Sequence, residues 1–294
     1  MGNQMRVAII GGSGKMGLWV ANFLLGEGYE VVITGRNEAK LLEAKRQLDV
    51  EVTTDNVEAV KRAKAIIISV PIDNFEGVVK QICSHIQPEQ VIVEITSIKS
   101  FPIEVMHKRI KTASVLGIHP MFGPGAKGVT NQNFILTPTD DKEATLAQKI
   151  KQFLEARGAR VAVMNPEEHD EMMAVILGLS HFIAIVSADI LLGFDKLNQM
   201  RKIGGTSFKL LLMLVESVLS ENPELYTSLQ MNLPHVAEVE RTFQKKVKDW
   251  ADLVESKDSG KFVERMKDLK NRLNQVNPDF GKAYEDMYKL IELL

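Results

Sequence analysis

Cysteine is almost absent from this sequence, because Cys83 is the only cysteine among 294 residues. A disulfide within the chain is therefore excluded, which is typical of a protein in a reducing compartment. A strong charge of either sign is also missing, since the net charge is −2 and the pI is near 6.3. We find no dense stripe of lysine and arginine with interleaved aromatic residues, and we expect no nucleic-acid partner.

A leader of charged, apolar and small residues is also missing before the first strand pattern, so we expect a cytoplasmic protein. One run, residues 172–194, is apolar and long enough to cross a membrane. It contains His181 and Asp189, and an ionisable group deep in lipid costs about 2.5–3.5 kcal/mol on insertion scales. We therefore interpret the run as a central helix buried in protein and expect no membrane partner.

Short apolar runs alternate with helical patterns as far as residue 164. Several runs are apolar almost throughout, as in strands that are covered on both faces. The alternation predicts a doubly wound, mostly parallel α/β sheet with helices on both sides. The predicted strands are residues 5–10, 30–34, 65–69, 91–95, 114–118, 133–137 and 160–164.

No strand pattern follows residues 165–171, where Pro166 and acidic residues mark a helix start. Helical patterns then continue, with breaks near Pro223, Pro234, residues 257–261 and Pro278. The change in pattern thus predicts an α/β domain at 1–164 and an all-helical domain at 165–294. Two helical stretches carry apolar residues close to heptad spacing, which indicates a core face, a subunit interface or both: Val236, Val239, Phe243, Val247, Trp250, Val254, and Phe262, Met266, Leu269, Leu273, Val276.

A glycine pattern, Gly12-x-Gly14-x-x-Gly17, follows the first predicted strand and opens a predicted helix. In this context the pattern is typical of a dinucleotide-binding domain of the Rossmann type. We expect Gly12 to allow the tight turn, Gly14 the approach of a pyrophosphate, and Gly17 close packing of the helix. The helix N-terminus supplies N–H groups for the phosphates. The predicted cofactor-binding residues here are Gly12, Ser13, Gly14, Lys15, Met16 and Gly17.

The end of the second strand, "ITGRNEAK", indicates which nucleotide binds. NAD sites usually have an acidic residue here, for the ribose 2′-hydroxyl. Gly35 and Arg36 stand in its place. Arg36 can pair with a 2′-phosphate, and Thr34 adds a hydroxyl, so the sequence predicts NADP, with NAD as the alternative. Because Ser69, Val70 and Pro71 follow another strand, we expect them to line the cofactor at the same edge.

A histidine in "GIHPMFGPG", His119, follows a predicted strand whose carboxyl end lies on the same rim. Ser97 and Lys99 in "EITSIKS" follow a neighbouring strand, so we expect all three around the nicotinamide. Histidine titrates near neutrality and can accept a proton from a substrate hydroxyl. The glycines at 117, 123 and 125 let the chain turn close to a ligand. No cluster of histidine, cysteine and acidic residues has metal-ligand spacing, and we expect no metal.

Together "GGSGKMG", "TSIKS", "HPMFGP", "GLSHF" and "ENPELYTSLQM" give a sequence that resembles the prephenate dehydrogenases over nearly its whole length. The resemblance implies oxidative decarboxylation of prephenate to 4-hydroxyphenylpyruvate in tyrosine biosynthesis, a helical dimerisation domain and a homodimer. It implies that His119 is the catalytic histidine on the substrate hydroxyl, assisted by Ser97, and that His181 is a second active-site histidine. We expect no additional regulatory or mutase domain.

The substrate's carboxylates require cations, and here the sequence departs from the pattern. Well-known bacterial members carry an arginine where our alignment places Ser217. Lys209 falls at a second basic position, and we take Lys209 and Gly123 as candidate substrate-binding residues. Arogenate, another small hydroxy acid or an imine therefore remain alternative substrates. A non-catalytic NADP-binding sensor is the alternative outside enzymes.

Overall fold

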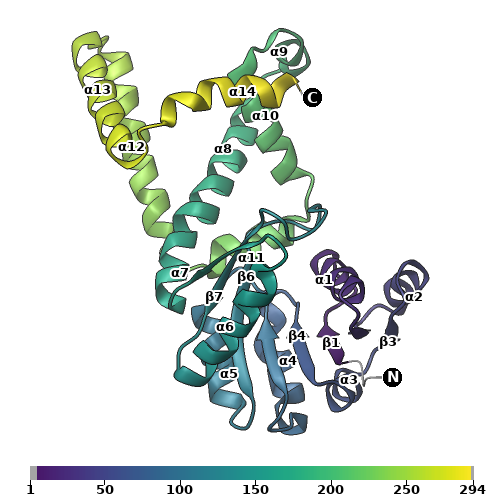
Figure 1. Ribbon diagram of the computed structural model, residues 1–294. Coiled ribbons are helices and arrows are strands. Elements are labelled where there is room, and N and C mark those ends of the chain that lie inside the picture. Colours follow the sequence, from purple (N-terminus) through teal and green to yellow (C-terminus); the bar gives the residue numbers. More distant parts are fainter. Residues whose placement is uncertain (1–4, 293–294) are drawn as a thin grey trace. The chain divides into compact units, whose positions relative to one another are not determined.

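Two compact units make up the chain in a computed structural model that describes residues 5–292 (Figure 1). The first unit extends to Met173 and includes Met231–Leu233, and the second contains Ala174–Gln230 and the residues from Pro234 onward. The composition changes after residue 164, whereas the units divide after Met173. The helix in between, Pro166–Met173, belongs to the first unit because one of its faces is buried there.

The first unit contains an eight-stranded sheet with the strand order β3-β2-β1-β4-β5-β6-β7-β8. All neighbouring strands are parallel except β6 and β7, which are antiparallel. The predicted doubly wound, mostly parallel sheet is confirmed, with an additional short strand, β3. The strands are β1 Arg6–Ile10, β2 Glu30–Thr34, β3 Glu51–Thr53, β4 Ala65–Ile68, β5 Val91–Glu94, β6 Ser114–Pro120, β7 Asn133–Thr137 and β8 Arg160–Val163.

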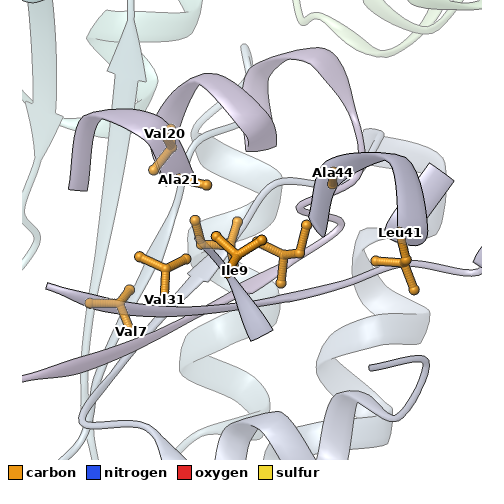
Figure 2. Close-up of a cluster of buried hydrophobic side chains, with 9 residues drawn as sticks. Val7, Ile9, Val20, Ala21, Val31, Leu41 and Ala44 are labelled. Carbon is orange, nitrogen blue, oxygen red and sulfur yellow. The ribbon is translucent and has the colours of Figure 1, made fainter. Parts of the chain in front are cut away.

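Helices cover both faces of this sheet. Figure 2 shows one buried cluster, in which Val7 and Ile9 of β1 pack against Val20 and Ala21 of the first helix. Strand residues that alternate with these, such as Ala8, are also buried, so the sheet lies between two helical layers. The helices are α1 Lys15–Gly26, α2 Glu38–Gln47, α3 Asn56–Arg62, α4 Ile72–Ile82, α5 Ser100–Arg109, α6 Asp141–Glu155 and α7 Pro166–Met173, with a short 3-10 helix at Cys83–His85.

The second unit is helical throughout its described residues. It begins with a π-helical segment, Ala174–Leu179, that continues directly into α8. Gly178 allows close packing here, because a Cβ at this position would lie 2.8 Å from a methyl group of Val236. The helices are α8 Ser180–Leu192, α9 Leu197–Ile203, α10 Thr206–Leu219, α11 Pro223–Asn232, α12 Val236–Glu255, α13 Ser259–Val276 and α14 Ala283–Glu292, with a 3-10 turn at Phe280–Lys282.

The apolar run at residues 172–194 is helical, but it is not a buried central helix as its composition predicts. The helix Pro166–Leu192 passes the length and composition test for a membrane span, and only 17% of its most apolar window is buried. A single such helix is weak evidence for a span. Several of its large apolar side chains are exposed on the single chain: Val175, Ile176, Ile185, Ile190 and Leu192.

The two heptad-like stripes on α12 and α13 are also largely exposed. Val236 is buried, whereas six other stripe residues are exposed: Val247, Val254, Met266, Leu269, Leu273 and Val276. A core face within one chain therefore does not account for most of the pattern. Exposed apolar side chains in such number are typical of a surface that binds another protein chain.

Candidate active site

The turn between β1 and α1 needs glycine at each of its first two positions. Gly11 has φ +80°, a conformation that other residues rarely adopt, so the sharp turn lies at Gly11 and not at Gly12 as predicted. Gly12 serves packing, because a Cβ there would lie 2.6 Å from Cβ of Ile33 on β2.

The next two glycines of the pattern differ from each other in what surrounds them. A Cβ on Gly17 would lie 2.6 Å from Cα of Gly12, so glycine lets α1 approach the turn closely. A Cβ on Gly14 would meet only the carbonyl oxygen of Gly11, at 3.4 Å. Gly14 therefore leaves open space at the N-terminus of α1, where no side chain caps the helix. This cradle, with Ser13, Lys15 and Met16 beside it, fits the pyrophosphate of a dinucleotide.

The end of β2 lies directly beside this cradle. A Cβ on Gly35 would lie 2.3 Å from the hydroxyl of Ser13, so glycine lets the two loops touch. Arg36 follows with an exposed side chain. Thr34 is fully buried and donates a hydrogen bond to Asn56 Oδ1 at 2.6 Å. The prediction that Thr34 offers its hydroxyl to the cofactor is therefore wrong for this structure, because that hydroxyl is enclosed and engaged.

The segment Ser69–Pro71 leaves β4 next to the same turn. The carbonyl oxygen of Ser69 and a methyl group of Val70 would lie 2.3 and 2.7 Å from a Cβ on Gly11. Ser69 N–H also donates to Ile10 O at 2.8 Å, and Pro71 leads into α4. Because β1 and β4 are where the strand order reverses, this segment lies where open α/β sheets bind ligands.

His119 lies within β6, one residue before the strand ends, and not beyond the strand. It pairs with Ile135 of the antiparallel β7, and its side chain is 4% exposed.

Ser97 is half-buried in the loop between β5 and α5. Gly123 is exposed and accepts a hydrogen bond from Ala126 N–H at 3.2 Å.

Lys99 is not on the rim of the site as predicted, because it is completely buried. Its ammonium group contacts the carboxylate of Glu94 and donates to Ile118 O at 3.0 Å. Glu94 also accepts hydrogen bonds from the amide and hydroxyl of Thr96, at 2.8 and 2.6 Å. A Cβ on Gly117 would lie 2.8 Å from Glu94 Oε1, so that glycine makes room for this ion pair and does not serve a turn.

A second histidine lies against His119. His119 Nδ1 and His169 Nε2 are 2.8 Å apart, and His169 Nδ1 is 2.8 Å from Asp170 Oδ1. Both His169 and Asp170 are buried on α7. Asp170 also accepts hydrogen bonds from the backbone N–H groups of Lys99 and Ser100, at 2.8 and 2.9 Å. Residues from β6, α7 and the start of α5 thus form one hydrogen-bonded chain.

Burial is the main cause that holds the pKa of His119 well below its usual range, and the neighbouring charges of Lys99 and His169 lower it further. Burial also lowers the pKa of His169, against the hydrogen bond to Asp170. Burial opposes ionisation of Asp170, but hydrogen bonds from His169, Ser100 and Lys99 outweigh it and lower the pKa of Asp170. Two neutral imidazoles beside an ionised carboxylate are therefore expected at neutral pH.

The helical unit carries the other predicted site residues. His181 on α8 packs its ring against Tyr226, with ring centroids 4.8 Å apart. Its Nδ1 is buried without a hydrogen-bond partner among the described residues, and burial lowers its pKa. Lys209 is exposed on α10. On the same helix Ser217 donates its hydroxyl to Leu214 O at 2.8 Å.

Comparison with known protein families agrees with this geometry. Residues 20–163 match the prephenate dehydrogenase nucleotide-binding domain, and residues 165–268 match the prephenate dehydrogenase dimerization domain. The chain belongs to the prephenate dehydrogenase family. The first match begins at residue 20 and does not include the glycine turn at residues 11–17. The case for that turn therefore rests on the backbone and packing geometry described above.

Relatives and solved structures from this family cover most of the chain. It is 34% identical over 269 residues to a probable arogenate/prephenate dehydrogenase of Methanocaldococcus jannaschii, covering 90% of this chain and 60% of that relative. Prephenate dehydrogenase from A. aeolicus, solved with hydroxyphenyl propionate and NAD+, has a TM-score of 0.76 at 22% identity, covering 94% of this chain and 99% of that one. Synechocystis arogenate dehydrogenase has a TM-score of 0.71 at 18% identity, covering 92% and 100%.

His169 and Asp170 were not among the predicted site residues, because the pattern of residues 165–171 indicates only an acidic helix start. A signal was present in the spacing. Pro166, His169, Asp170 and Met173 follow helical periodicity, and all four are buried on one face of α7. An adjacent histidine and aspartate on such a face indicate a buried polar network rather than solvated charges.

Proposed function

We propose that this chain catalyses the oxidative decarboxylation of prephenate to 4-hydroxyphenylpyruvate and CO2. The observation that carries the proposal is the burial of His119, which holds its pKa well below its usual range, at the sheet edge that holds the nucleotide cradle. A nicotinamide dinucleotide, held by the cradle at the β1–α1 turn, would supply the acceptor for the hydride that leaves the substrate carbon bearing the hydroxyl. His119 accepts the hydroxyl's hydrogen bond and takes its proton as that carbon is oxidised. Loss of CO2 then makes the ring aromatic, and the proton returns to the phenol.

We also propose that the protein prefers NADP. Arg36 leaves β2 next to Ser13 of the cradle, and no carboxylate stands at the end of this strand. A guanidinium fork matches a 2′-phosphate, which an acidic residue at that position would repel. The buried Thr34 takes no part in this version of the site, so the preference depends on Arg36.

The assembly that we propose is a cytoplasmic homodimer. The exposed apolar stripes of α12 and α13 support it, together with the match of residues 165–268 to a dimerization domain. His181, Lys209, Ser97 and Gly123 stay proposed site residues, with Lys209 as the candidate partner of a substrate carboxylate. Lysine offers a point charge in place of the arginine fork. Prephenate and arogenate are therefore both candidate substrates for this site.

The test is direct. Purified protein is mixed with prephenate and either NADP or NAD, and absorbance of the reduced cofactor at 340 nm is followed. Rapid reduction of NADP supports the reaction and the cofactor preference together. Reduction of NAD alone supports the proposed reaction but contradicts the NADP preference inferred from Arg36.

Arogenate is the second candidate substrate, because the relative from Methanocaldococcus jannaschii carries both substrates in its name. The same assay with arogenate decides between them by the ratio of kcat/KM. Protein that binds nucleotide but reduces it with neither compound would contradict the proposed function.

A further inference from the structure

Asp170 is a buried acceptor that receives three N–H groups. The donors are the backbone amides of Lys99 and Ser100 and Nδ1 of His169, at 2.8, 2.9 and 2.8 Å. An ionised carboxylate can only accept hydrogen bonds, so the hydrogen between Asp170 and His169 belongs to Nδ1 of His169. The two backbone donors anchor Asp170 at the start of α5, and its orientation is therefore fixed independently of either histidine.

The tautomer of His119 follows from that of His169. A neutral His169 that carries its hydrogen on Nδ1 has a lone pair on Nε2. The contact of 2.8 Å between His169 Nε2 and His119 Nδ1 then requires a hydrogen on His119 Nδ1. A neutral His119 consequently has its remaining lone pair on Nε2. Hydrogen positions are thus assigned here from the network of donors and acceptors.

We infer that His169 and Asp170 are positioning residues that hold His119 in the Nδ1–H tautomer, so that Nε2 is the atom that accepts the substrate's hydroxyl proton. The role of Nε2 rests on the proposed function, whereas the tautomer does not. No bond to carbon forms or breaks in this relay. One proton moves from the substrate oxygen to Nε2 and back, while Nδ1 keeps its hydrogen bond to His169.

The charges around His119 explain why its hydrogen bond to the His169–Asp170 pair is useful when Nε2 takes a proton. Lys99 lies near both histidines and disfavours positive charge on either ring, and its own partner is Glu94. Asp170 is the carboxylate that contacts the histidine pair directly. It favours positive charge on His169 and, through the shared hydrogen bond, offsets the charge that develops on His119 when Nε2 takes the proton.

Imidazole ¹⁵N NMR of the intact protein reads the tautomers without turnover. We expect a protonated Nδ1 and an unprotonated Nε2 for both His119 and His169 at neutral pH, with signals assigned by loss in His119→Asn and His169→Gln. A protonated Nε2 on His119 in the wild-type protein would overturn the inference. This measurement stands even when the substrate proves to be another compound.

Three variants then separate positioning from structure. Asp170→Asn can present its amide hydrogens to His169, which reverses both tautomers and leaves a hydrogen on His119 Nε2. We expect kcat to fall by about 10²–10⁴-fold, the usual contribution of a positioned general base, with KM for the substrate and Kd for the cofactor nearly unchanged. His169→Leu removes the acceptor for His119 and should lose a similar factor.

His169→Gln is the conservative rescue, because an amide can accept from His119 through its oxygen and donate to Asp170 through its nitrogen. We expect its kcat within about tenfold of the wild-type value, since the hydrogen-bond pattern is kept. Glu89→Gln, which changes an exposed carboxylate of the same unit, is the control for effects of mutation and purification that do not involve the histidine pair. Equal losses in His169→Gln and His169→Leu, or an unchanged kcat and tautomer in folded Asp170→Asn, would reject the positioning role.

Failure of this inference and failure of the proposed function give different results. A protein with the expected tautomers that turns over neither prephenate nor arogenate contradicts the function alone. A protein that turns over prephenate with a hydrogen on His119 Nε2 contradicts the positioning role alone. Circular dichroism and thermal midpoints establish that each variant is folded, and the wild-type spectrum decides the question if the variants are not.

Discussion

Arg36 is the single side chain proposed to determine which nicotinamide cofactor is used. We expect Arg36→Ser to lower kcat/KM for NADP by about 10- to 100-fold, because a hydrogen bond to a charged group contributes about 1.5–3 kcal/mol. The value for NAD should change little. Arg46→Ser, an exposed arginine of α2 that pairs with Glu43, is the matched control. An equal loss for both cofactors would contradict the assignment of Arg36 to the 2′-phosphate.

Lys99 and Glu94 form a buried pair whose members depend on each other. Burial lowers the pKa of Lys99 and raises that of Glu94, and each opposes this effect in its partner. Lys99→Met leaves Glu94 unpaired, and the free energy of unfolding should fall by about 3–5 kcal/mol. The double variant Glu94→Gln, Lys99→Met should be less destabilised than this single variant, as urea denaturation would show. A double variant as unstable as Lys99→Met would mean that the pair is not coupled.

Residue types predicted some parts of the site and not others. The glycine pattern and His119 follow from local spacing, because a turn and a strand end are local features. The burial of Lys99 and Thr34 depends on partners 5 and 22 residues away in the chain, Glu94 and Asn56. The burial of these two side chains is determined by tertiary packing, which a spacing pattern does not predict.

The turn from β1 into α1 contains one glycine required for packing, Gly17, and one proposed to bind the cofactor, Gly14. Gly17→Ala places a methyl group against the backbone of Gly11 and Gly12, and overpacking of this kind costs about 1–3 kcal/mol. Gly14→Ala meets only one oxygen, at 3.4 Å, in a backbone conformation open to any residue. We expect Gly17→Ala to lower the thermal midpoint. Gly14→Ala should keep the midpoint and weaken cofactor binding about tenfold or more, equivalent to at least 1.4 kcal/mol.

Calorimetry and a fluorescence titration of the reduced cofactor would measure these two effects. A Gly14→Ala variant that binds the cofactor as tightly as the wild type would mean that the phosphates do not approach Gly14. A Gly17→Ala variant with an unchanged midpoint would mean that α1 moves without cost.

Elements with a clear hydrophobic period were predicted well, and short ones were not. Seven strands and the helix breaks at Pro223 and after residue 257 follow from the pattern. Strand β3 has only three residues, Glu51–Thr53, which is too few for a period to be recognised. Strand β6 ends at Pro120 and was predicted to end at residue 118, because its last two residues, His119 and Pro120, are ordered by pairing with β7.

At the scale of the whole molecule, large apolar side chains of the described residues are exposed on α8, α12 and α13. A hydrophobic period marks a face that avoids water, but it does not distinguish a chain's own core from a partner's surface. The stripes on α12 and α13 were open to both interpretations, whereas the long helix through α8 was predicted to be buried. Exposure of Val254 and Met266 on the single chain now favours the interface.

A dimer should therefore depend on these stripes. We expect the wild-type protein to sediment as a dimer, and Met266→Glu or Val254→Glu to shift it toward monomer, because a carboxylate in an apolar interface loses its hydration. Asn271→Glu adds the same charge at an exposed polar position of α13 and should leave the dimer intact. A monomeric wild-type protein at micromolar concentration would contradict the proposed assembly.

The placement of His119, the proposed base, inside β6 has a consequence for the entropy of catalysis. A base on a flexible loop loses rotational freedom each time a substrate binds, whereas a base on a paired strand loses that freedom once, when the chain folds. With β5 parallel on one side of β6 and β7 antiparallel on the other, the backbone that carries the imidazole is ordered before any substrate arrives. Binding free energy is then available for distorting and orienting the substrate, and the activation entropy should be only slightly unfavourable.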